Sequence, residues 1–376
     1  MKIVIAIDSF KGSLSSLQAG NAVKGGILQV FPDAETIVKP LADGGEGTVE
    51  AFAGAAGVRT EEITVTGPLY QPVTAKYCIL ADGITAVMEM AAAAGITLIA
   101  DAQRNPLETT TYGVGELIKD AIGKGCRRFI IGIGGSATND GGIGMLSALG
   151  YAFEDKNGKT VATCGKGLKD IAAISTENVL PALAECAFRI ACDVENPLCG
   201  ETGCSAIYGP QKGATPEMIA DMDGWLANYA ALAKTLSEKA DPLQPGVGAA
   251  GGLGFAFLAF TNAELKSGIQ LILEEISLEK DVKNADIVIT GEGRLDAQTV
   301  MGKAPIGVAK LAKKYGKKVI AFSGCVTEDA EVCNDHGIDA FFPALRKVTT
   351  LDEALNPENA YQNLQKTATQ VFRLLR

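Results

Sequence analysis

Histidine and paired cysteine motifs are nearly absent from this chain of 376 residues, and their scarcity excludes several classes of chemistry. The one histidine, His336, lies between Asp335 and Gly337, where we expect a turn or a helix end. One histidine cannot build a Ser-His triad or a histidine metal site. The nine cysteines show no C-x-x-C pair or zinc-ligand spacing, and we interpret them as reduced thiols. Catalysis by this chain would therefore use carboxylates, lysine or arginine, backbone amides and a bound metal ion.

Positive charge is also scarce. The formal net charge is −10, and no dense stripe of lysine and arginine occurs, so we expect no nucleic-acid partner. The longest apolar stretch, residues 86–100, is interrupted by Glu89 and is too short to span a bilayer. No basic segment with a cleavage site opens the chain. We therefore expect a cytoplasmic protein without a membrane partner, which binds any anion through a few cations gathered in one cleft.

Aromatic residues make up only 6% of the chain, whereas 44 residues are glycine. This mixture favours closely packed layers of helix on sheet over a sandwich or a barrel. Apolar runs of strand length alternate with helical segments at both ends, for example at residues 2–8 and 284–290. Residues 61–67 and 73–81 alternate in the manner of antiparallel strands. The sequence therefore predicts an α/β protein with doubly wound parallel ends and a mixed middle.

These patterns predict two domains. Residues 1–68 and 280–376 are expected to form one parallel-sheet domain from both chain ends, and residues 69–279 an inserted mixed α/β domain. By composition, the Pro- and Gly-rich stretch 241–254 is the expected hinge.

The first candidate site is the segment DSFKGSLSS, which ends the first predicted strand. Asp8 and Ser9 would lie at the carboxyl edge of a parallel sheet, where ligands bind in open α/β folds. Lys11 would supply a point charge for a carboxylate or a phosphate. A capped helix followed by a solvated lysine explains the same residues.

The second candidate site is ADGGEGT, again at a strand end. Asp43 can accept a hydrogen bond from a substrate hydroxyl, and Gly44 and Gly45 let the backbone approach a ligand. Glu46 adds acidity beside them. A glycine turn with acidic first-turn residues is the structural alternative, but two such edges together favour a functional site.

The third candidate site is the glycine-rich loop GIGGSATNDGGIG at residues 132–144. Backbone amides freed by glycine can hold phosphate oxygens, and asparagine and aspartate suit Mg²⁺ or a hydroxyl. Its candidate nucleotide-binding residues are Gly134, Gly135, Ser136, Thr138, Asn139 and Asp140.

The same loop also matches a weaker pattern. Gly132, Gly134 and Ala137 fit the G-x-G-x-x-A form of a dinucleotide fingerprint, with Glu154 and Asp155 about 20 residues further on. An NAD(P)-dependent hydroxy-acid dehydrogenase is therefore a competing interpretation. No Walker A pattern occurs, which disfavours an ordinary P-loop nucleotide fold.

Two further segments carry charged side chains at strand ends. In ACDVENPL, Asp193 could take the proton from an attacking hydroxyl, as an aspartate does in many kinases. In TGEGRLDAQTVMGKAP, Arg294 could hold a carboxylate, and Glu292 or Asp296 could hold Mg²⁺ directly or through water; Lys303 follows. A surface cluster of ion pairs explains the second segment nearly as well, but the apolar strand that leads directly into G-E-G favours a functional site.

Taken together, long motifs spread in order over the chain resemble those of the bacterial glycerate kinase family, type I. They are KIVIAIDSFKGSLS, PLADGGEGT, GIGGSATNDGG, ACDVENPLCG, YGPQKGA, GAAGGLGFA, ELKSGI and VITGEGRLDAQTVMGKAPIGVA. The resemblance implies a flavodoxin-like domain built from both chain ends and an inserted domain resembling the restriction-endonuclease fold. It also implies ATP and Mg²⁺ as cofactors and glycerate as the substrate, with 2-phosphoglycerate favoured over 3-phosphoglycerate as the product.

The resemblance also suggests roles for the candidate residues. Asp193 would be the general base, and Lys11 would contact substrate or phosphate. Asp8, Ser9, Asp43, Gly44 and Gly45 would line the glycerate side, and the 134–140 loop would hold the nucleotide phosphates. Arg294, Asp296 and Lys303 would serve the substrate carboxylate, the metal and the transferred phosphoryl group, with Glu292 as a further metal ligand. A non-catalytic protein that binds a small acid stays an alternative, as does the dehydrogenase.

Overall fold

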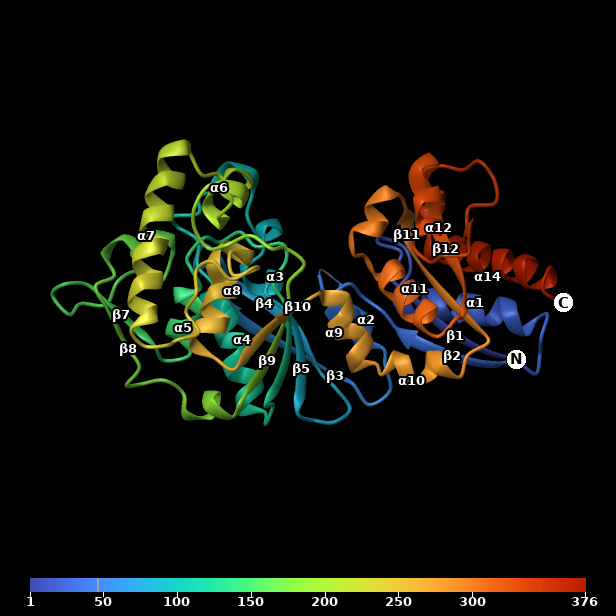
Figure 1. The fold of residues 1–376 in the computed structure, drawn as a ribbon, viewed down its shortest axis with the longest axis horizontal. Coiled ribbons are helices and arrows are strands. Elements are labelled where there is room, and N and C mark those ends of the chain that lie inside the picture. Colours follow the sequence, from blue (N-terminus) through green and yellow to red (C-terminus); the bar gives the residue numbers. More distant parts are fainter. Residues whose placement is uncertain (46) are drawn as a thin grey trace. The chain divides into compact units, whose positions relative to one another are not determined.

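The structure is a computed structural model that describes residues 1–45 and 47–376. The chain forms two compact units (Figure 1). The first contains residues 1–56 and 267–376, and the second contains residues 57–266. The first unit is thus assembled from both ends of the chain.

The first unit has a five-stranded sheet in the order β13-β12-β11-β1-β2, and all its neighbouring strands are parallel. Its strands are β1 (Lys2–Ile7), β2 (Glu35–Pro40), β11 (Ile287–Leu295), β12 (Lys318–Val326) and β13 (Ala340–Pro343). Ile5 of β1 lies opposite Val38 of β2 and Ile289 of β11. Residues 3–7 are fully buried, as expected for a continuous apolar run in a parallel sheet covered on both faces.

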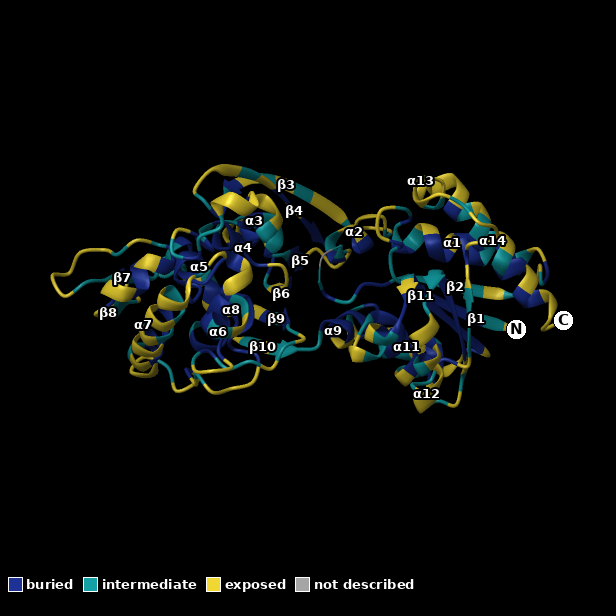
Figure 2. Cartoon of the chain, turned by 90° about the horizontal axis from the view of Figure 1, so that it is seen from above, coloured by how far each residue is buried: buried dark blue, intermediate teal, exposed yellow. Residues whose placement is uncertain are grey.

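Helices cover both faces of this sheet. The helices of the first unit are α1 (Ser16–Leu28), α2 (Thr48–Ala53), α9 (Gly268–Glu275), α10 (Leu278–Lys283), α11 (Ala304–Lys314), α12 (Val332–Asp335), α13 (Leu351–Leu355) and α14 (Pro357–Arg373). Ser15 and Gln18 form a capping box at the start of α1. α1 and α14 pack together, and the buried stripe of α14, which includes Leu364 and Phe372, joins the core formed by Ile3 and Ile289 (Figure 2). α11 packs against β11 and β12.

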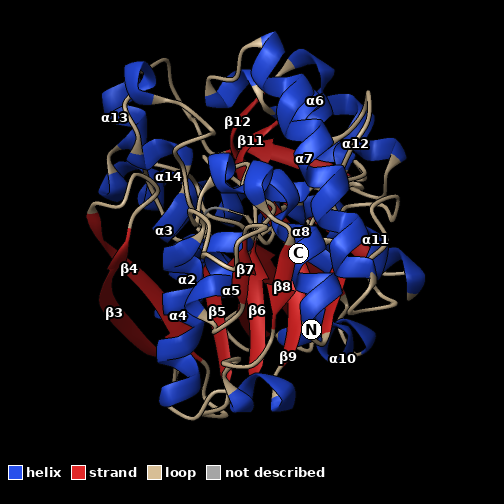
Figure 3. Cartoon of the chain, turned by 90° about the vertical axis from the view of Figure 1, so that its left-hand side faces the viewer, coloured by secondary structure: helices blue, strands red, loops and turns tan. Residues whose placement is uncertain are grey.

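The second unit has a six-stranded mixed sheet in the order β10-β9-β6-β5-β4-β3. The strands are β3 (Arg59–Thr66), β4 (Pro72–Ile79), β5 (Thr85–Glu89), β6 (Arg128–Gly132), β9 (Ala187–Ala191) and β10 (Ala263–Lys266). β5, β6, β9 and β10 are parallel, whereas β3, β4 and β5 are antiparallel neighbours (Figure 3). The predicted antiparallel pair in the middle of the chain is confirmed.

The remaining elements of the second unit surround this sheet. They are α3 (Ala91–Ala94), α4 (Tyr112–Gly123), α5 (Ile143–Ala148), α6 (Cys204–Tyr208), α7 (Pro216–Lys234), α8 (Ala249–Phe260) and a small hairpin of β7 (Ala152–Glu154) and β8 (Ala173–Ser175). Short 3₁₀ helices occur in both units at Ile96–Leu98, Asp101–Gln103, Gly165–Asp170, Pro181–Glu185, Pro210–Lys212, Ala297–Met301 and Glu328–Glu331. The chain is therefore a mixed α/β protein, as predicted.

The boundaries between the units lie about a dozen residues before the positions expected from the sequence, at 56/57 and 266/267 instead of 68/69 and 279/280. β3 pairs along its whole length with β4, so it belongs to the second sheet. α9 packs against α11 of the first unit. Pairing and packing partners, which a local pattern does not reveal, decide both boundaries.

The expected hinge at residues 241–254 is wrong, because this stretch lies inside the second unit. Its residues from 246 onward are buried and lead into α8. A Cβ atom on Gly248 would lie 2.2 Å from the carbonyl oxygen of Pro197, so glycine there permits close backbone packing. Its glycines serve a packed interior here, not a flexible linker.

Within the described residues, no helix combines the length and apolar character that crossing a membrane requires. All nine cysteines are free thiols in the structure, which agrees with their scattered spacing.

Candidate active site

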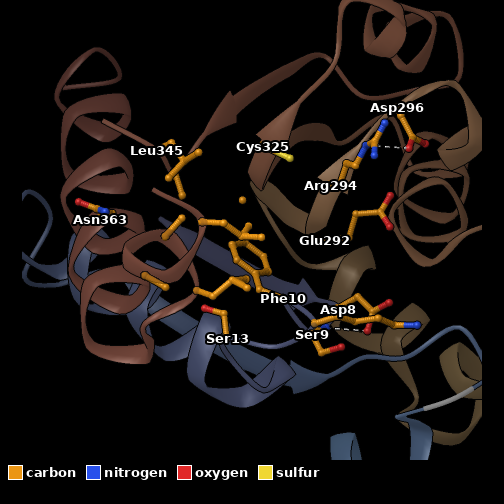
Figure 4. A pocket seen from close by; sticks show the side chains of 18 of the residues that line it. Asp8, Ser9, Phe10, Ser13, Glu292, Arg294, Asp296, Cys325, Leu345 and Asn363 are labelled. Atoms are coloured by element: carbon orange, nitrogen blue, oxygen red, sulfur yellow. Dashed lines mark hydrogen bonds and ion pairs between the residues drawn. The ribbon is translucent and has the colours of Figure 1, made fainter. Parts of the chain in front are cut away.

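A pocket of about 420 Å³ lies at the carboxyl edge of the first unit's sheet (Figure 4). It is reached by residues that follow or end β1, β11, β12 and β13, and all the residues that line it belong to the first unit. β1 lies between β2 and β11, so the chain connections reverse direction at the β1/β11 pair. Open α/β sheets bind ligands at such a switch point.

Asp8 and Ser9 lie at this switch point, directly after β1. The backbone N–H of Asp8 donates to the carbonyl oxygen of Gly291 in β11 over 2.9 Å, and the N–H of Ser9 donates to Oδ1 of Asp8 over 2.6 Å. Burial raises the pKa of Asp8 to about 7, and the nearby Asp43 and Glu292 add to the shift. Asp8 is therefore poised to exchange a proton or to receive a cation near neutral pH.

Asp43 lines the same pocket and organises the turn after β2. Its Oδ1 accepts a hydrogen bond from the backbone N–H of Gly45 over 2.9 Å. Gly44 and Gly45 form the turn but do not line the pocket. Glu46, named with them in the sequence, lies outside the described residues.

Glu292, Arg294, Asp296 and Lys303 form an ion-pair network on one side of the pocket (Figure 4). Nζ of Lys303 lies 3.4 Å from Oδ1 of Asp296 and 3.8 Å from Oε2 of Glu292. Nε of Arg294 lies 3.3 Å from Oδ2 of Asp296. Burial raises the pKa of Glu292, whereas a hydrogen bond of 2.7 Å from Oγ1 of Thr299 opposes the shift. The sequence was compatible with either a surface cluster of ion pairs or a functional site. In the structure all four side chains line a pocket.

Lys11 also lines the pocket, from the exposed turn between β1 and α1. Its charge acts to lower the pKa of Asp8. The pocket thus holds four carboxylates and three cationic side chains. They are Asp8, Asp43, Glu292, Asp296, Lys11, Arg294 and Lys303.

The donor set fits a magnesium ion that arrives with a phosphate. Burial and the charges of Asp43 and Glu292 raise the pKa of Asp8, and burial and the charges of Asp296 and Asp43 raise the pKa of Glu292, as expected of carboxylates gathered in one pocket. No group of three His, Cys, Asp or Glu side chains has metal-binding geometry in residues 1–45 and 47–376. Mg²⁺ is commonly held by one or two carboxylates together with substrate phosphates. Both oxygens of Asp296 are already paired, which makes Glu292 the better placed of the two predicted metal ligands.

The glycine-rich loop belongs to the second unit and lies after β6. Gly134 and Gly135 are exposed, and Ser136 is nearly buried. Thr138, Asn139 and Asp140 are completely buried. Their side chains therefore lie in the interior of the second unit.

Asp140 holds this loop together. Its Oδ2 accepts hydrogen bonds from N and Oγ1 of Thr111, both over 2.8 Å, and its Oδ1 accepts one from the N–H of Gly142 over 3.0 Å. The N–H of Gly144 donates to Oδ2 over 3.4 Å. Burial raises the pKa of Asp140, and these donors counteract the rise. The side chain fixes the start of α5.

Lys212 is a buried lysine whose importance the sequence did not reveal. Its Nζ donates to the carbonyl oxygen of Thr138 over 2.6 Å, and burial lowers its pKa to about 8. Nδ2 of Asn139 donates to Oγ of Ser205 over 2.9 Å. In the sequence Lys212 stands in an ordinary Pro/Gly turn, and nothing local indicates that the turn packs beneath another loop.

The dinucleotide fingerprint lacks its structural context. That motif requires a helix that opens at the glycines after the strand. Here α5 begins only at Ile143, after a left-handed Gly142, and Ala137 lies in a buried loop. The match of Gly132, Gly134 and Ala137 is therefore coincidental.

Asp193 follows β9 in the second unit and is exposed. β9 is the parallel neighbour of β6, so Asp193 and the exposed Gly134 follow adjacent strands at the same sheet edge. The structure thus brings the candidates together in two sets, one in each unit.

His336 ends α12, and its Nδ1 lies 2.9 Å from the carbonyl oxygen of Val332, which confirms the predicted helix end.

The doubly wound sheet and its charged pocket define an α/β protein built to bind an anionic ligand at a switch point. Comparison with known proteins identifies the family to which this α/β protein belongs. The profile of the glycerate kinase family matches residues 3–376. The chain belongs to this family, which makes it an enzyme of the phosphotransferase class.

Named relatives match over nearly their whole length. A glycerate kinase of Haemophilus influenzae is 49% identical over 100% of this chain and 99% of its own. A glycerate 2-kinase of Escherichia coli is 47% identical over 99% of this chain and 97% of its own. A crystal structure of a candidate glycerate kinase 2 from Salmonella typhimurium LT2 superposes with a TM-score of 0.92 at 47% identity, over 100% of this chain and 98% of that one.

Proposed function

We propose that this protein transfers the γ-phosphoryl group of ATP to a hydroxyl of glycerate, with Mg²⁺, and so produces phosphoglycerate. The family and the names of the relatives support the substrate. The observation that carries the proposal is the cluster of Asp8, Asp43 and Glu292 with Lys11 and Lys303 at the switch point. Phosphoryl transfer depends on positioning and on neutralising charge, which such a cluster provides.

The carboxylates are proposed to hold the metal, and the cations the phosphate and acid groups. Asp8 and Glu292 would bind Mg²⁺ together with phosphate oxygens. The bound ion would neutralise negative charge on the transferred group. Lys303, now paired with two carboxylates, would be released toward the phosphoryl group, and Arg294 would bind a carboxylate or phosphate through its guanidinium.

Asp193 is the proposed general base, because it is an exposed carboxylate at the end of a parallel strand. Asp8 is the alternative base, with Glu292 then left to bind the metal, since a pKa of about 7 matches the proton affinity that a base needs near neutral pH. Asp193→Asn separates the two assignments, because turnover close to that of the wild type in this variant would transfer the role of the base to Asp8.

The decisive experiment measures ADP release and phosphoglycerate formation from ATP and D-glycerate, with and without EDTA. For Asp193→Asn we expect turnover to fall by roughly a hundredfold at unchanged KM, because a general base acts only in the chemical step. A non-catalytic acid-binding protein would keep its ligand affinity and show no turnover in any variant. Lack of ADP release by the wild type would refute the proposal.

We infer that 2-phosphoglycerate is the product, because the E. coli relative is named a glycerate 2-kinase. Phosphorus NMR of the product from each glycerate enantiomer distinguishes the 2-phosphate from the 3-phosphate. A resonance at the position of authentic 3-phosphoglycerate would contradict this inference.

We also propose that the first unit is a flavodoxin-like domain and that the second resembles the restriction-endonuclease fold. Counted within the first unit, the strand order is 2-1-3-4-5, which is the order of flavodoxin-like sheets. The mixed six-stranded sheet of the second unit is compatible with the second assignment. An experimental structure of the chain tests both through strand order and direction.

A further inference from the structure

The pocket of the first unit has an apolar half that glycerate and metal chemistry do not use. In Figure 4, Glu292, Arg294 and Asp296 lie on one side, Leu345 and Asn363 on the other, and Phe10 between them. The apolar half is lined by Phe10, Ala344, Leu345, Leu351, Ala354, Leu355 and Ala360. It is built from the end of β13, the short helix α13 and the start of α14.

Three leucines of this half are exposed to solvent. Leu345, Leu351 and Leu355 retain 37%, 72% and 36% of their accessible surface. Apolar surface left in water costs free energy in proportion to its area. Exposed apolar side chains gathered at one pocket therefore mark a surface that a ligand covers.

Glycerate is too small and too polar to be that ligand. It has three carbons, and each bears a carboxylate oxygen or a hydroxyl. The volume of about 420 Å³ falls within the range of roughly 300–1,000 Å³ that is usual for sites of larger ligands. A purine nucleoside offers the missing surface, because its ring has two apolar faces and a polar edge.

The pocket also carries a group suited to that polar edge. Asn363 of α14 lines the apolar half, and an asparagine amide can pair with N6 and N7 of adenine through one donor and one acceptor. Arg294 lies on the opposite side (Figure 4), Lys303 is paired there with Asp296, and Lys11 also lines the pocket, so that these cations can bind a polyphosphate. The order from apolar wall to cations matches the order from base to phosphates in a nucleoside triphosphate.

We propose that the apolar half binds the adenosine of ATP, with the triphosphate directed to Lys11 and Lys303. This inference rests on the proposed function and specifies where its nucleotide binds. It differs from the sequence-based expectation that the 134–140 loop of the second unit holds the nucleotide phosphates. The first unit then contains the whole nucleotide site.

The test uses Leu355→Asn with Val348→Asn as the matched control. Leu355 lines the pocket, whereas Val348 is fully exposed nearby and does not line it. Because the side chains of Leu355 and Val348 are both exposed, neither substitution should unfold the chain. We expect Leu355→Asn to raise KM for ATP by about tenfold or more, a difference of about 1.4 kcal/mol, and to leave KM for glycerate unchanged. Val348→Asn should alter neither.

Inhibition by fragments of ATP shows whether Leu355→Asn weakens binding of the adenosine or of the triphosphate. Adenosine should compete with ATP in the wild type and lose its inhibition in Leu355→Asn, whereas tripolyphosphate should inhibit both equally. An enzyme that phosphorylates glycerate, with the same KM for ATP and the same adenosine inhibition in Leu355→Asn, would overturn the adenosine site but leave the proposed function intact.

Direct labelling keeps the inference testable even if no phosphoglycerate forms. Photolabelling of the full chain with 8-azidoadenosine should modify peptides within residues 344–363, and adenosine should protect them. Modification confined to residues 133–144 would overturn the proposal.

Discussion

Asp8 in the first unit and Asp140 in the second both follow strands of parallel pairs, and burial raises the pKa of both. Their neighbours differ. Asp140 is surrounded by donors from Thr111, Gly142 and Gly144, which stabilise its negative charge. Asp8 faces two further carboxylates, which oppose its charge.

The difference in neighbouring groups indicates that the loop of Asp140 stabilises the fold and that the loop of Asp8 binds a ligand. A carboxylate whose hydrogen bonds are satisfied within the protein stabilises the fold. Carboxylates gathered against one another cost stability, and such an arrangement is typical of sites that a cation or substrate completes. Replacing the two aspartates should therefore change stability in opposite directions.

The largest expected effect is that of Asp140→Ala, which leaves the buried donors of Thr111 and Gly142 unpaired. We expect the free energy of unfolding to fall by about 4 kcal/mol. Urea unfolding followed through Trp225, the one tryptophan of the chain and part of the second unit, measures it. Asp155→Ala is the control, because Asp155 accepts backbone hydrogen bonds in an exposed turn, and its loss should be much smaller. If Asp140→Ala and Asp155→Ala lower the free energy of unfolding equally, the buried hydrogen bonds of Asp140 do not have the stabilising role proposed for them.

Gly251→Ala tests the same loop from the backbone side. Gly251 has φ of +66°, and a Cβ atom would lie 2.2 Å from the carbonyl oxygen of Thr138. We expect a loss of roughly 3 kcal/mol from the left-handed conformation and the clash. Gly134 is the matched control, since a Cβ atom there meets nothing within 4 Å. If Gly134→Ala destabilises the unit as much, the account of this loop as a packed interior with an exposed tip is wrong.

Asp8→Asn should stabilise the protein while it abolishes most activity. The folded-state pKa of about 7 exceeds the unfolded value, so the stability from protonated Asp8 is complete below about pH 4 and is lost as the pH rises to 7. The asparagine avoids this loss, and we expect it to add on the order of 2 kcal/mol at pH 8 and little at pH 4. Phosphorylation should fall by at least about a hundredfold.

Circular dichroism during urea unfolding at the two pH values measures this change. Asp33→Asn, at an exposed position of the same unit, is the control and should show no such pH dependence. A variant of Asp8 less stable than the wild type at pH 8 would contradict the assignment of the carboxylate cluster to ligand binding.

Lys212→Met is expected to have the smallest effect. The change removes the hydrogen bond to Thr138, but it also removes the cost of burying a charge, and the two largely cancel to within about 1 kcal/mol at pH 7. Because burial lowers the pKa of Lys212 to about 8, only the wild type should gain stability as the pH rises from 8 toward 10. Fluorescence of Trp225 during unfolding at pH 7 and pH 9.5 checks both statements. Equal pH dependence in the two proteins would show that Lys212 does not titrate as proposed.

Much of the fold could be predicted because local pattern follows burial. The uninterrupted apolar residues 3–7 predicted a buried parallel strand, and the alternation in residues 61–67 predicted an antiparallel one. The polar residues of the first pocket were found for a similar reason, since parallel strands deliver their carboxyl ends to one edge. The leucines that line its apolar half carried no signal, because an exposed Leu355 resembles any surface residue in the sequence.

The glycine-rich loop shows where prediction from sequence stops. Its composition fits a phosphate site and a packed interior equally well, because glycine permits close approach to a ligand and to another part of the chain alike. Burial of Asn139 and Asp140 distinguishes the two, and burial depends on partners such as Lys212, more than seventy residues away.

The sequence by itself determined the family, the α/β class and the strand ends that carry polar residues, because motifs and periodicity are local properties of the chain. The tertiary structure alone decided which carboxylates oppose one another and which are satisfied. Electrostatic and hydrogen-bond energies depend on distance in space, and Asp8 and Glu292 become neighbours only when β1 and β11 pair.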